Sequence, residues 1–253
     1  MVERALDILE CFSAEKAERG ITEIAADLKI YKSRAFRLVK TLEGRGFLWQ
    51  NPETGRYRLG LKLLGLSHLV EQELGWRQRV RPILEDLSLK TGGTTTLRVM
   101  ENLEIHTIDV VESSDILKVA YPIGTRMPFS YGSHGLVLSA ALPEPAVRQA
   151  IRERGLRRYT SRTITAPTRF LERLRAVRRQ GYAFCDEGVT IGVRSVAVPV
   201  RNREGEVVAS VGVSLPKARF PMERLVEVVR LAKQAAEALS AGVGHRITAG
   251  GTA

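Results

Sequence analysis

A cluster of basic and hydroxyl side chains in residues 32–41 has the chemistry of a nucleic-acid contact. Arg34, Arg37 and Thr41 fall at i, i+3 and i+7, which places them on one stripe of a helix. An arginine guanidinium offers two parallel donors to a guanine edge or a phosphate, and a hydroxyl can bond either. The other outward residues of the segment are Lys32, Ser33 and Lys40. A solvated helix face normally mixes charge signs, so this face predicts binding to double-stranded DNA.

Three short helices are predicted to position that face. Apolar residues recur at helical spacing in residues 2–13, and residues 23–28 form a second helix with the Thr22 hydroxyl as its expected N-cap. Residues 29–31 make the turn into the third helix, which Gly44 ends. This order of helix, turn and helix is typical of a DNA-binding motif.

A β-hairpin is predicted directly after the helices. Residues 47–50 and 57–59 read as short strands around a loop that carries Pro and Gly where a hairpin needs them. We therefore expect a winged helix-turn-helix domain over residues 1–60. Arg56 and Arg58 on the hairpin, and Thr22, complete its expected DNA-binding set. The alternative is a small helical subdomain that binds protein or only dimerises.

Residues 61–76 are predicted to form an apolar linker helix. The segment is rich in leucine and carries few charges. A helix this hydrophobic between two domains must be buried against another surface, and a partner chain is the expected one. The sequence thus predicts a homo-oligomer, either a dimer or a dimer of dimers.

Residues 77–244 are predicted to form a second, larger domain. After a first helix, β-branched segments alternate with amphipathic ones. We expect strands at 94–100, 105–111, 117–121, 182–187, 193–201 and 207–214, and helices at 132–141, 144–154, 169–180 and 221–241. An antiparallel sheet flanked by helices gives the whole chain the fold class α+β. The small, polar tail 245–253 is expected to be disordered.

Composition and charge agree with a DNA-binding protein of two domains. The chain has 253 residues and a formal net charge of +11, which favours an anionic partner. No apolar run approaches the length of about 18 residues that a membrane-spanning helix needs. We therefore expect a cytoplasmic protein with no membrane partner.

A second basic block lies in residues 148–179. It holds eleven arginines against two glutamates. Apolar residues fall between the arginines at helical spacing, so the block is interpreted as the solvated outer face of two helices. Contact of this block with DNA is the alternative.

Catalytic and metal centres have no recognisable motif in this sequence. It contains no Gly-x-Ser-x-Gly and no phosphate-binding Gly-Lys-Ser, so we expect neither an enzyme nor a cofactor. Cys11 and Cys185 are too far apart for metal-ligand spacing. Two alternatives remain open: a metal held by His106, His134 and Cys185, and a redox switch at Cys185, which would need a lowered thiol pKa.

Two regions of the chain resemble a known family. Residues 20–66 include Gly-Ile-Thr-Glu-Ile-Ala, Thr-Leu-Glu-Gly-Arg-Gly-Phe and Thr-Gly-Arg-Tyr-Arg-Leu-Gly. Residues 181–187 read Gly-Tyr-Ala-Phe-Cys-Asp-Glu, and residues 192–200 read Gly-Val-Arg-Ser-Val-Ala-Val-Pro-Val. These segments resemble the DNA-binding and effector domains of the IclR family of bacterial regulators. The resemblance implies a GAF-like effector domain, oligomers that are dimers of dimers in many members, and gene control by a small metabolite.

The resemblance also implies an effector pocket in the second domain. Carried onto this chain, its positions are Ile116, Val119, Met127, Ser133, His134, Cys185, Ser195, Gly212 and Ser214. Three of them depart from the family pattern. Cys185 stands where many members have an acidic residue, Ser195 stands where they have Cys, and His134 stands where a small residue is common.

Those departures change the expected effector. Loss of the acidic group makes the pocket less polar there, so we expect a compound with a hydrophobic or aromatic body and one carboxylate or carbonyl. Ile116, Val119 and Met127 would form the apolar wall, and His134, Ser195 and Ser214 would be among the polar groups that orient the compound. The competing hypothesis is a DNA-binding architectural protein without a ligand.

Overall fold

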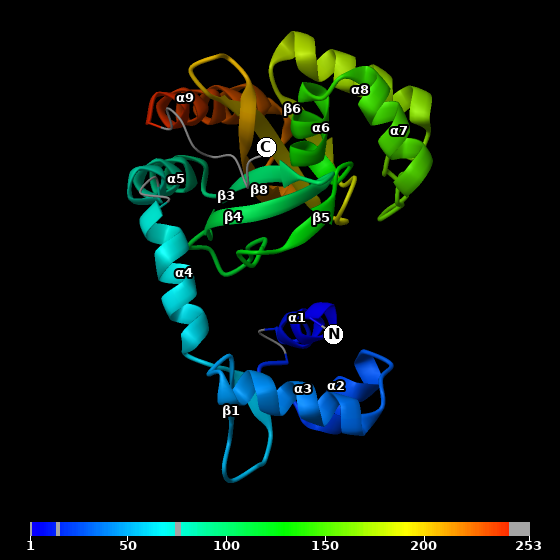
Figure 1. Cartoon of the computed structure of the whole chain (residues 1–253). Helices are drawn as coiled ribbons and strands as arrows, with labels where there is room; N and C mark the ends of the chain where they lie inside the picture. Colours follow the sequence, from blue (N-terminus) through cyan, green and yellow to red (C-terminus); the bar gives the residue numbers. More distant parts are fainter. Residues whose placement is uncertain (1, 14–15, 74–76, 243–253) are drawn as a thin grey trace. The chain divides into compact units, whose positions relative to one another are not determined.

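The computed structural model describes residues 2–13, 16–73 and 77–242, which form two compact units divided after residue 73 (Figure 1). The predicted linker 61–76 is helical from Lys62 to Glu73, and this helix belongs to the first unit. Residues 74–76 of the linker and the tail 245–253 lie outside the described residues. The described helices are all too short or too polar to cross a bilayer.

The first unit is a three-helix domain closed by a hairpin and followed by one more helix. Its elements are α1 (Val2–Glu10), α2 (Ile21–Asp27), α3 (Lys32–Gly44), β1 (Leu48–Gln50), β2 (Tyr57–Leu59) and α4 (Lys62–Glu73). Ile8, Ile24, Val39 and Tyr57 meet in one buried core, so the apolar stripes of the three helices and the hairpin face the same centre. The expected winged helix-turn-helix is confirmed.

The start of α2 differs from the prediction. Thr22 is exposed in the first turn and does not cap the helix, whose N-cap is Gly20. The Glu23 carboxylate accepts a hydrogen bond from the Gly20 N–H at 2.9 Å. A carboxylate at the third helical position can satisfy a free N–H group and favours the positive end of the helix dipole. The helix therefore begins before Thr22 without needing its hydroxyl.

The second unit is one antiparallel sheet with helices on both faces. Its helices are α5 (Arg77–Thr91), α6 (Gly132–Ala141), α7 (Glu144–Arg154), α8 (Pro167–Gln180) and α9 (Leu225–Gly242), with 3-10 turns η1 (Lys217–Arg219) and η2 (Met222–Arg224). Its strands are β3 (Thr94–Glu101), β4 (Glu104–Val111), β5 (Arg126–Pro128), β6 (Ala183–Asp186), β7 (Val193–Arg201) and β8 (Val207–Pro216). The strand order is β5-β4-β3-β8-β7-β6. The α+β fold class is confirmed.

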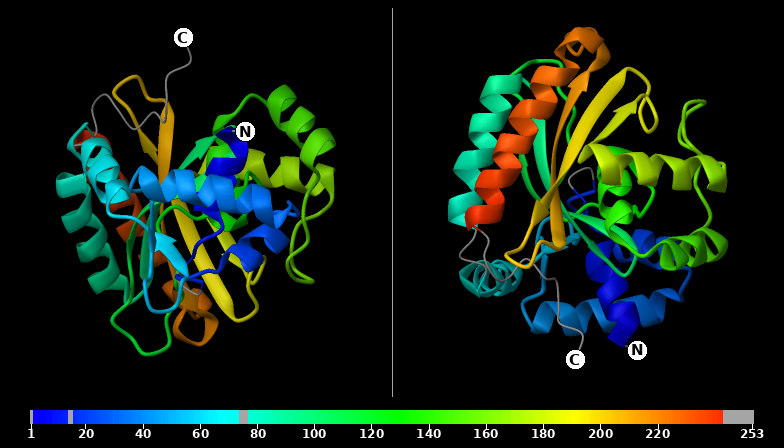
Figure 2. Two further views of the ribbon diagram at one scale, coloured as in Figure 1. Left: turned by 60° about the horizontal axis from the view of Figure 1, so that its bottom comes forward. Right: turned by 90° about the horizontal axis from the view of Figure 1, so that it is seen from above.

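The two faces of this sheet bury different side chains. Figure 2 shows α5 and α9 side by side on one face and α6 and α8 on the other. Leu97 and Val99 of β3 point toward α5 and α9, where they join the larger apolar core. The alternate residues Thr96 and Arg98 therefore point toward α6, because successive side chains of a strand face opposite sides. The α6 side is thus the polar face of the central strand.

One predicted strand is wrong. Residues 117–121 lie in a loop, and the edge of β4 is covered instead by residues 124–128, which include β5. The Gly124 N–H donates to the Thr107 carbonyl at 2.8 Å, and the Thr107 N–H donates to the Thr125 carbonyl at 3.1 Å. These bonds extend the pairing of β5 and occupy the backbone groups that residues 117–121 would have used.

The contact between α6 and the segment before it tests this packing. A Cβ added at Gly135 would lie 2.6 Å from the Ser130 carbonyl carbon and 2.7 Å from the Phe129 oxygen. We expect Gly135→Ala to lower the free energy of unfolding by about 1–3 kcal/mol, because the backbone must shift to admit the methyl group. At Gly44, also helical, an added Cβ meets nothing within 4 Å. Gly44→Ala is therefore the control, and equal destabilisation of both variants in urea would contradict the packing described.

Candidate DNA interface and effector site

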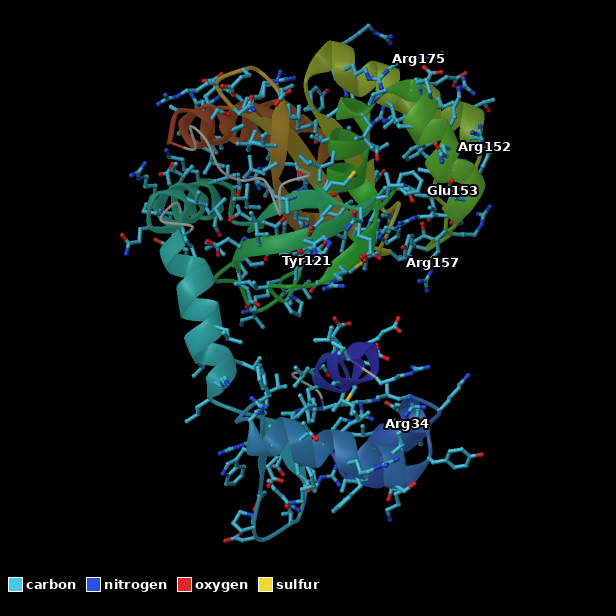
Figure 3. All side chains as sticks on the ribbon, in the orientation of Figure 1. Arg34, Tyr121, Arg152, Glu153, Arg157 and Arg175 are labelled. Atoms are coloured by element: carbon cyan, nitrogen blue, oxygen red, sulfur yellow. The ribbon has the colours of Figure 1, made fainter. Side chains whose placement is uncertain are left out.

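The exposed face of α3 is basic, and three of its cations have no side-chain partner among the described residues. Lys32, Ser33, Arg34 and Arg37 are exposed, whereas Ala35, Val39 and Leu42 of the same helix are buried. Across the described ranges, the side chains of Lys32, Arg34 and Arg37 form no hydrogen bond or ion pair. Arg34 extends from the first turn of the helix (Figure 3). These cations are therefore free to meet a phosphate or a base edge.

Lys40, Thr41, Arg56 and Arg58, which were also predicted to bind DNA, are engaged inside the domain. Arg56 pairs with the Glu23 carboxylate at 2.8 Å and also donates to the Glu18 carbonyl at 3.0 Å. Lys40 pairs with Glu43 at 2.7 Å, and the Thr41 hydroxyl donates to the carbonyl of Arg37 one turn earlier. The guanidinium of Arg58 lies over the Trp49 ring, 4.0 Å from its centroid. The Arg56 contacts tie the hairpin to α2 and to the segment before it, whereas the other contacts lie within α3 or within the hairpin.

Two exposed aromatic residues on α3 were missed by the sequence analysis. Tyr31, at the N-cap, has 86% of its surface exposed, and Phe36 is exposed one turn later. Phe36 falls out of the apolar phase set by Ala35 and Val39, and that mismatch was the signal available in the sequence.

Five of the predicted effector residues meet at a small cavity on the polar face of the sheet. These are Ser133 and His134 of α6, Cys185 of β6, Ser195 of β7 and Ser214 of β8. Ser133 and Ser195 share a hydrogen bond of 2.9 Å between their hydroxyls. The cavity has a volume of about 20 Å³, which is room for one water molecule.

His134 is held from both sides by hydroxyl groups. Its Nδ1 lies 2.7 Å from the Ser210 hydroxyl and its Nε2 lies 2.9 Å from the Thr96 hydroxyl. Burial, and secondarily the charge of Arg98, hold the pKa of His134 well below its ordinary value. The ring is therefore neutral, and both of its nitrogens are already bonded. It fastens α6 to the sheet and leaves no nitrogen for a ligand.

The remaining predicted effector residues lie away from this cavity. Ile116 is fully exposed, and neither Val119 nor Met127 lines the cavity. Met127 packs instead near Ile105. Gly212 lies beneath α6, where an added Cβ would approach His134 Nε2 to 2.6 Å. Gly212 therefore allows the backbone of β8 to lie close to the His134 ring.

Cys185 has the environment of an inert thiol. Burial raises the pKa of Cys185 above its ordinary value, so the nucleophilic thiolate is disfavoured. In the described part of the chain, His, Cys, Asp and Glu side chains do not gather in groups of three that could hold a metal ion.

An arginine that the sequence analysis missed lines the same cavity. Arg98 of β3 has only 2% of its surface exposed, and its Nε atom has no hydrogen-bond partner. Its guanidinium lies 4.5 Å from the Tyr121 ring centroid and 5.9 Å from that of Tyr131. Burial lowers the pKa of Arg98, yet arginine stays charged in proteins. A charged residue in the middle of a strand of threonines and apolar residues was the available signal.

The arginines of residues 148–179 are partly committed to structural contacts. Arg148 and Arg175 both pair with Glu144. Arg178 donates to the carbonyls of Ala140 and Leu142. Figure 3 shows Arg175 beside α8, and Arg152 with Glu153 on α7. Much of this block therefore stabilises the helix packing of the second unit.

The family comparisons agree with both halves of this description. The IclR helix-turn-helix domain matches residues 1–52, and the C-terminal domain of the bacterial transcriptional regulator IclR matches residues 68–241. The HTH-type transcriptional regulator XynR of Escherichia coli strain K12 is 36% identical over 245 residues, covering 96% of this chain and 97% of that protein.

Solved structures show the same architecture over nearly the whole chain. An IclR transcriptional regulator from Alicyclobacillus acidocaldarius has a TM-score of 0.85 and 27% identity, with 96% of this chain and 98% of that chain covered. An IclR homologue from Microbacterium hydrocarbonoxydans, complexed with 4-hydroxybenzoate, has a TM-score of 0.85, 23% identity and the same coverage. The chain belongs to the IclR family of bacterial transcriptional regulators, which join a DNA-binding helix-turn-helix domain to an effector-binding domain.

Proposed function

We propose that α3 binds an operator in double-stranded DNA and that a small organic acid, bound between the sheet and α6, controls this binding. The observation that carries the first part is the free basic face of α3. Lys32, Arg34 and Arg37 are exposed and make no side-chain bond within the described residues. A helix with such a face fits the major groove, where arginine reads guanine and binds phosphate.

The operator contact is tested by variants of α3 and of the wing. We expect Arg34→Ala and Arg37→Ala each to lose about 1–3 kcal/mol of operator binding if they read a base. Lys32→Ala should lower the slope of affinity against salt by about one, through a lost phosphate contact. Arg56→Ala should leave that slope nearly unchanged, because Arg56 is paired with Glu23. Gel shifts across a salt series measure all four variants.

Arg152→Ala is the matched control for this experiment. Arg152 is an exposed arginine of α7, so its loss removes one positive charge without touching the helix-turn-helix domain. Unchanged affinity in both Arg34→Ala and Arg37→Ala would reject α3 as the recognition helix. A loss as large in Arg152→Ala would instead indicate DNA contact by the second basic block.

The effector proposal is supported by the buried polar cavity beneath α6. Hydroxyl groups of Ser133, Ser195 and Ser214 line it together with aromatic and apolar side chains. Polar groups that converge on an enclosed site can fix the orientation of a bound small molecule. A protein of the same fold is complexed with 4-hydroxybenzoate, an aromatic acid.

Thermal shift measurements test the effector class. A ligand that binds only the native state adds about 2.7 kcal/mol of stability at a hundredfold excess over its dissociation constant. We expect aromatic acids to raise the melting temperature and to change operator affinity, and short keto acids and lactones to have smaller effects. A large shift with glyoxylate or pyruvate and none with aromatic acids would contradict the proposed effector class. No shift with any compound would favour the ligand-free architectural protein.

The linker helix is proposed to join two copies of the chain. Leu61 and Leu64 have 81% and 66% of their surfaces exposed at the start of α4. Apolar side chains this exposed on a helix mark an association surface. A dimer would also present two recognition helices to half-sites spaced about 10 bp or a multiple apart.

Light scattering tests this assembly. We expect the parent protein to be a dimer or tetramer at micromolar concentration, and Leu64→Glu to shift it toward monomer because two charges would be buried together. Leu89→Glu is the matched control, since Leu89 is similarly exposed on α5. A monomeric parent protein, or equal dissociation in both variants, would exclude α4 as the main contact.

We further propose that the protein is a cytoplasmic, non-enzymatic regulator. Its matched relatives are named as transcriptional regulators. The buried thiol of Cys185 and the doubly bonded His134 lack the reactivity that a catalytic pair needs.

A further inference from the structure

Arg98 is a buried cation without a counter-ion. Its guanidinium forms no ion pair or hydrogen bond with any residue that the structure describes, and the rings of Tyr121 and Tyr131 lie against it. A buried charge is ordinarily paired or bound to a ligand. Aromatic faces attract a cation, but they do not satisfy its N–H donors. In the free protein, the Arg98 guanidinium therefore has no anion to accept its hydrogen bonds.

The side chains around Arg98 do not provide an anion. His134 is neutral, and its nitrogens are bonded to Thr96 and Ser210. No carboxylate lines the cavity in the described part of the chain. The side chains that do line it are hydroxyls, aromatic rings and short apolar groups. This set suits a planar carboxylate, which takes two parallel bonds from an arginine while the rings contact its body.

The present cavity is too small for such a ligand. A volume of about 20 Å³ holds one water molecule, so part of the wall must move. Tyr121 belongs to a loop without regular structure after β4 (Figure 3), whereas Arg98 and His134 belong to a strand and a helix. The loop is fastened at its ends, where Ser113 bonds to β3 and Gly124 to β4. Val189 and Thr190 also line the cavity from the loop between β6 and β7, but Tyr121 is the loop residue whose ring lies against the Arg98 guanidinium, so its departure would free the guanidinium without unfolding the sheet.

We infer that Arg98 anchors the carboxylate of an aromatic monocarboxylic effector, and that the Tyr121 ring occupies the effector's place on Arg98 until it binds. This inference rests on the proposed function, because it names the ligand class of the same cavity. The body of the effector lies against Tyr131, and the carboxylate replaces Tyr121 as the partner of the guanidinium.

An outer basic depression adjoins the cavity. It has a volume of about 780 Å³ and includes Gly132 and Cys185, which also line the inner cavity. Its arginines outnumber its acids: Arg158, Arg162, Arg169 and Arg173 against Glu172 and Asp186. A depression of this sign raises the local concentration of anions and their association rate. The depression outside the cavity and Arg98 inside it therefore both attract an anion.

Substitutions at Arg98 test the anchor, with benzoate, 4-hydroxybenzoate and 3-phenylpropanoate as probes and benzamide as the uncharged analogue of benzoate. At least one acid should raise the melting temperature of the parent protein, and benzamide should not. Arg98→Met should melt at a higher temperature than the parent without ligand, because an unpaired buried charge is removed. It should also lose the acid response. Arg230→Met, an exposed arginine of α9, is the control and should resemble the parent.

Two further variants decide the question if Arg98→Met fails to fold. Arg98→Lys keeps the charge but loses the planar fork, so acid binding should weaken at least about tenfold in calorimetry. Tyr121→Ala removes the ring that the effector displaces, so acid binding should tighten by about threefold to tenfold.

The outcomes separate this inference from the proposed function. An acid response that persists in Arg98→Met, or stays at parental strength in Arg98→Lys, overturns the anchor. Weaker acid binding in Tyr121→Ala overturns the displacement. A melting shift with benzamide but with no acid overturns the ligand class, although a ligand-controlled regulator would stand. Failure of the α3 variants to affect operator binding would instead count against the proposed function.

Discussion

The imidazole of His134 lies directly against the backbone of Gly212, and this contact joins α6 to the middle of the sheet. A side chain at Gly212 would bring its Cβ to 2.6 Å from the ring, so glycine is required for the approach. Thr96 and Ser210 hold the ring from neighbouring strands. Because the ring is neutral and fully bonded, it can be buried without a counter-ion. The separation of α6 from the sheet, and with it the cavity that Ser133 helps to line, follows from this contact.

The two faces of the central strand β3 lie in different environments. Leu97 and Val99 enter the apolar core formed with α5 and α9, which is the main source of stability for the second unit. Arg98 lies between them in sequence and points to the opposite face, where its burial is unfavourable by several kcal/mol. Apolar packing on one face therefore offsets a destabilising charge on the other. A protein keeps such a conflict where the charge has a function.

The sequence was sufficient for the elements whose pattern is local. The periodicity of residues 32–44 located α3 and separated its basic face from its buried face. Arg98 could not be found in this way, because its importance depends on the pairing of Arg98 with Ser210 and on which helices cover each face. Residues 117–121 have the composition of a strand, but only the folded chain shows that residues 124–128 occupy the available edge.

Contacts between residues far apart in the sequence also explain why the predictions for the wing and for the apolar wall of the effector pocket were incomplete. Arg56 is basic and close to the predicted DNA contacts in sequence, but its partner Glu23 lies 33 positions away. Ile116 and Val119 were assigned to the wall through family positions near a predicted strand that the protein lacks. The two hydroxyls bonded to His134 come from β3 and β8, and no spacing within the sequence indicates that they meet.

The edges of the sheet are much shorter than its centre. β5 and β6 hold three and four residues, whereas the four inner strands hold between eight and ten. β5 also ends in Pro128, which has no N–H group to donate. Long unpaired edges are templates for aggregation by strand addition, and short edges limit it. Where copies of this protein are close together, the short edges therefore limit growth of the sheet from one molecule into the next.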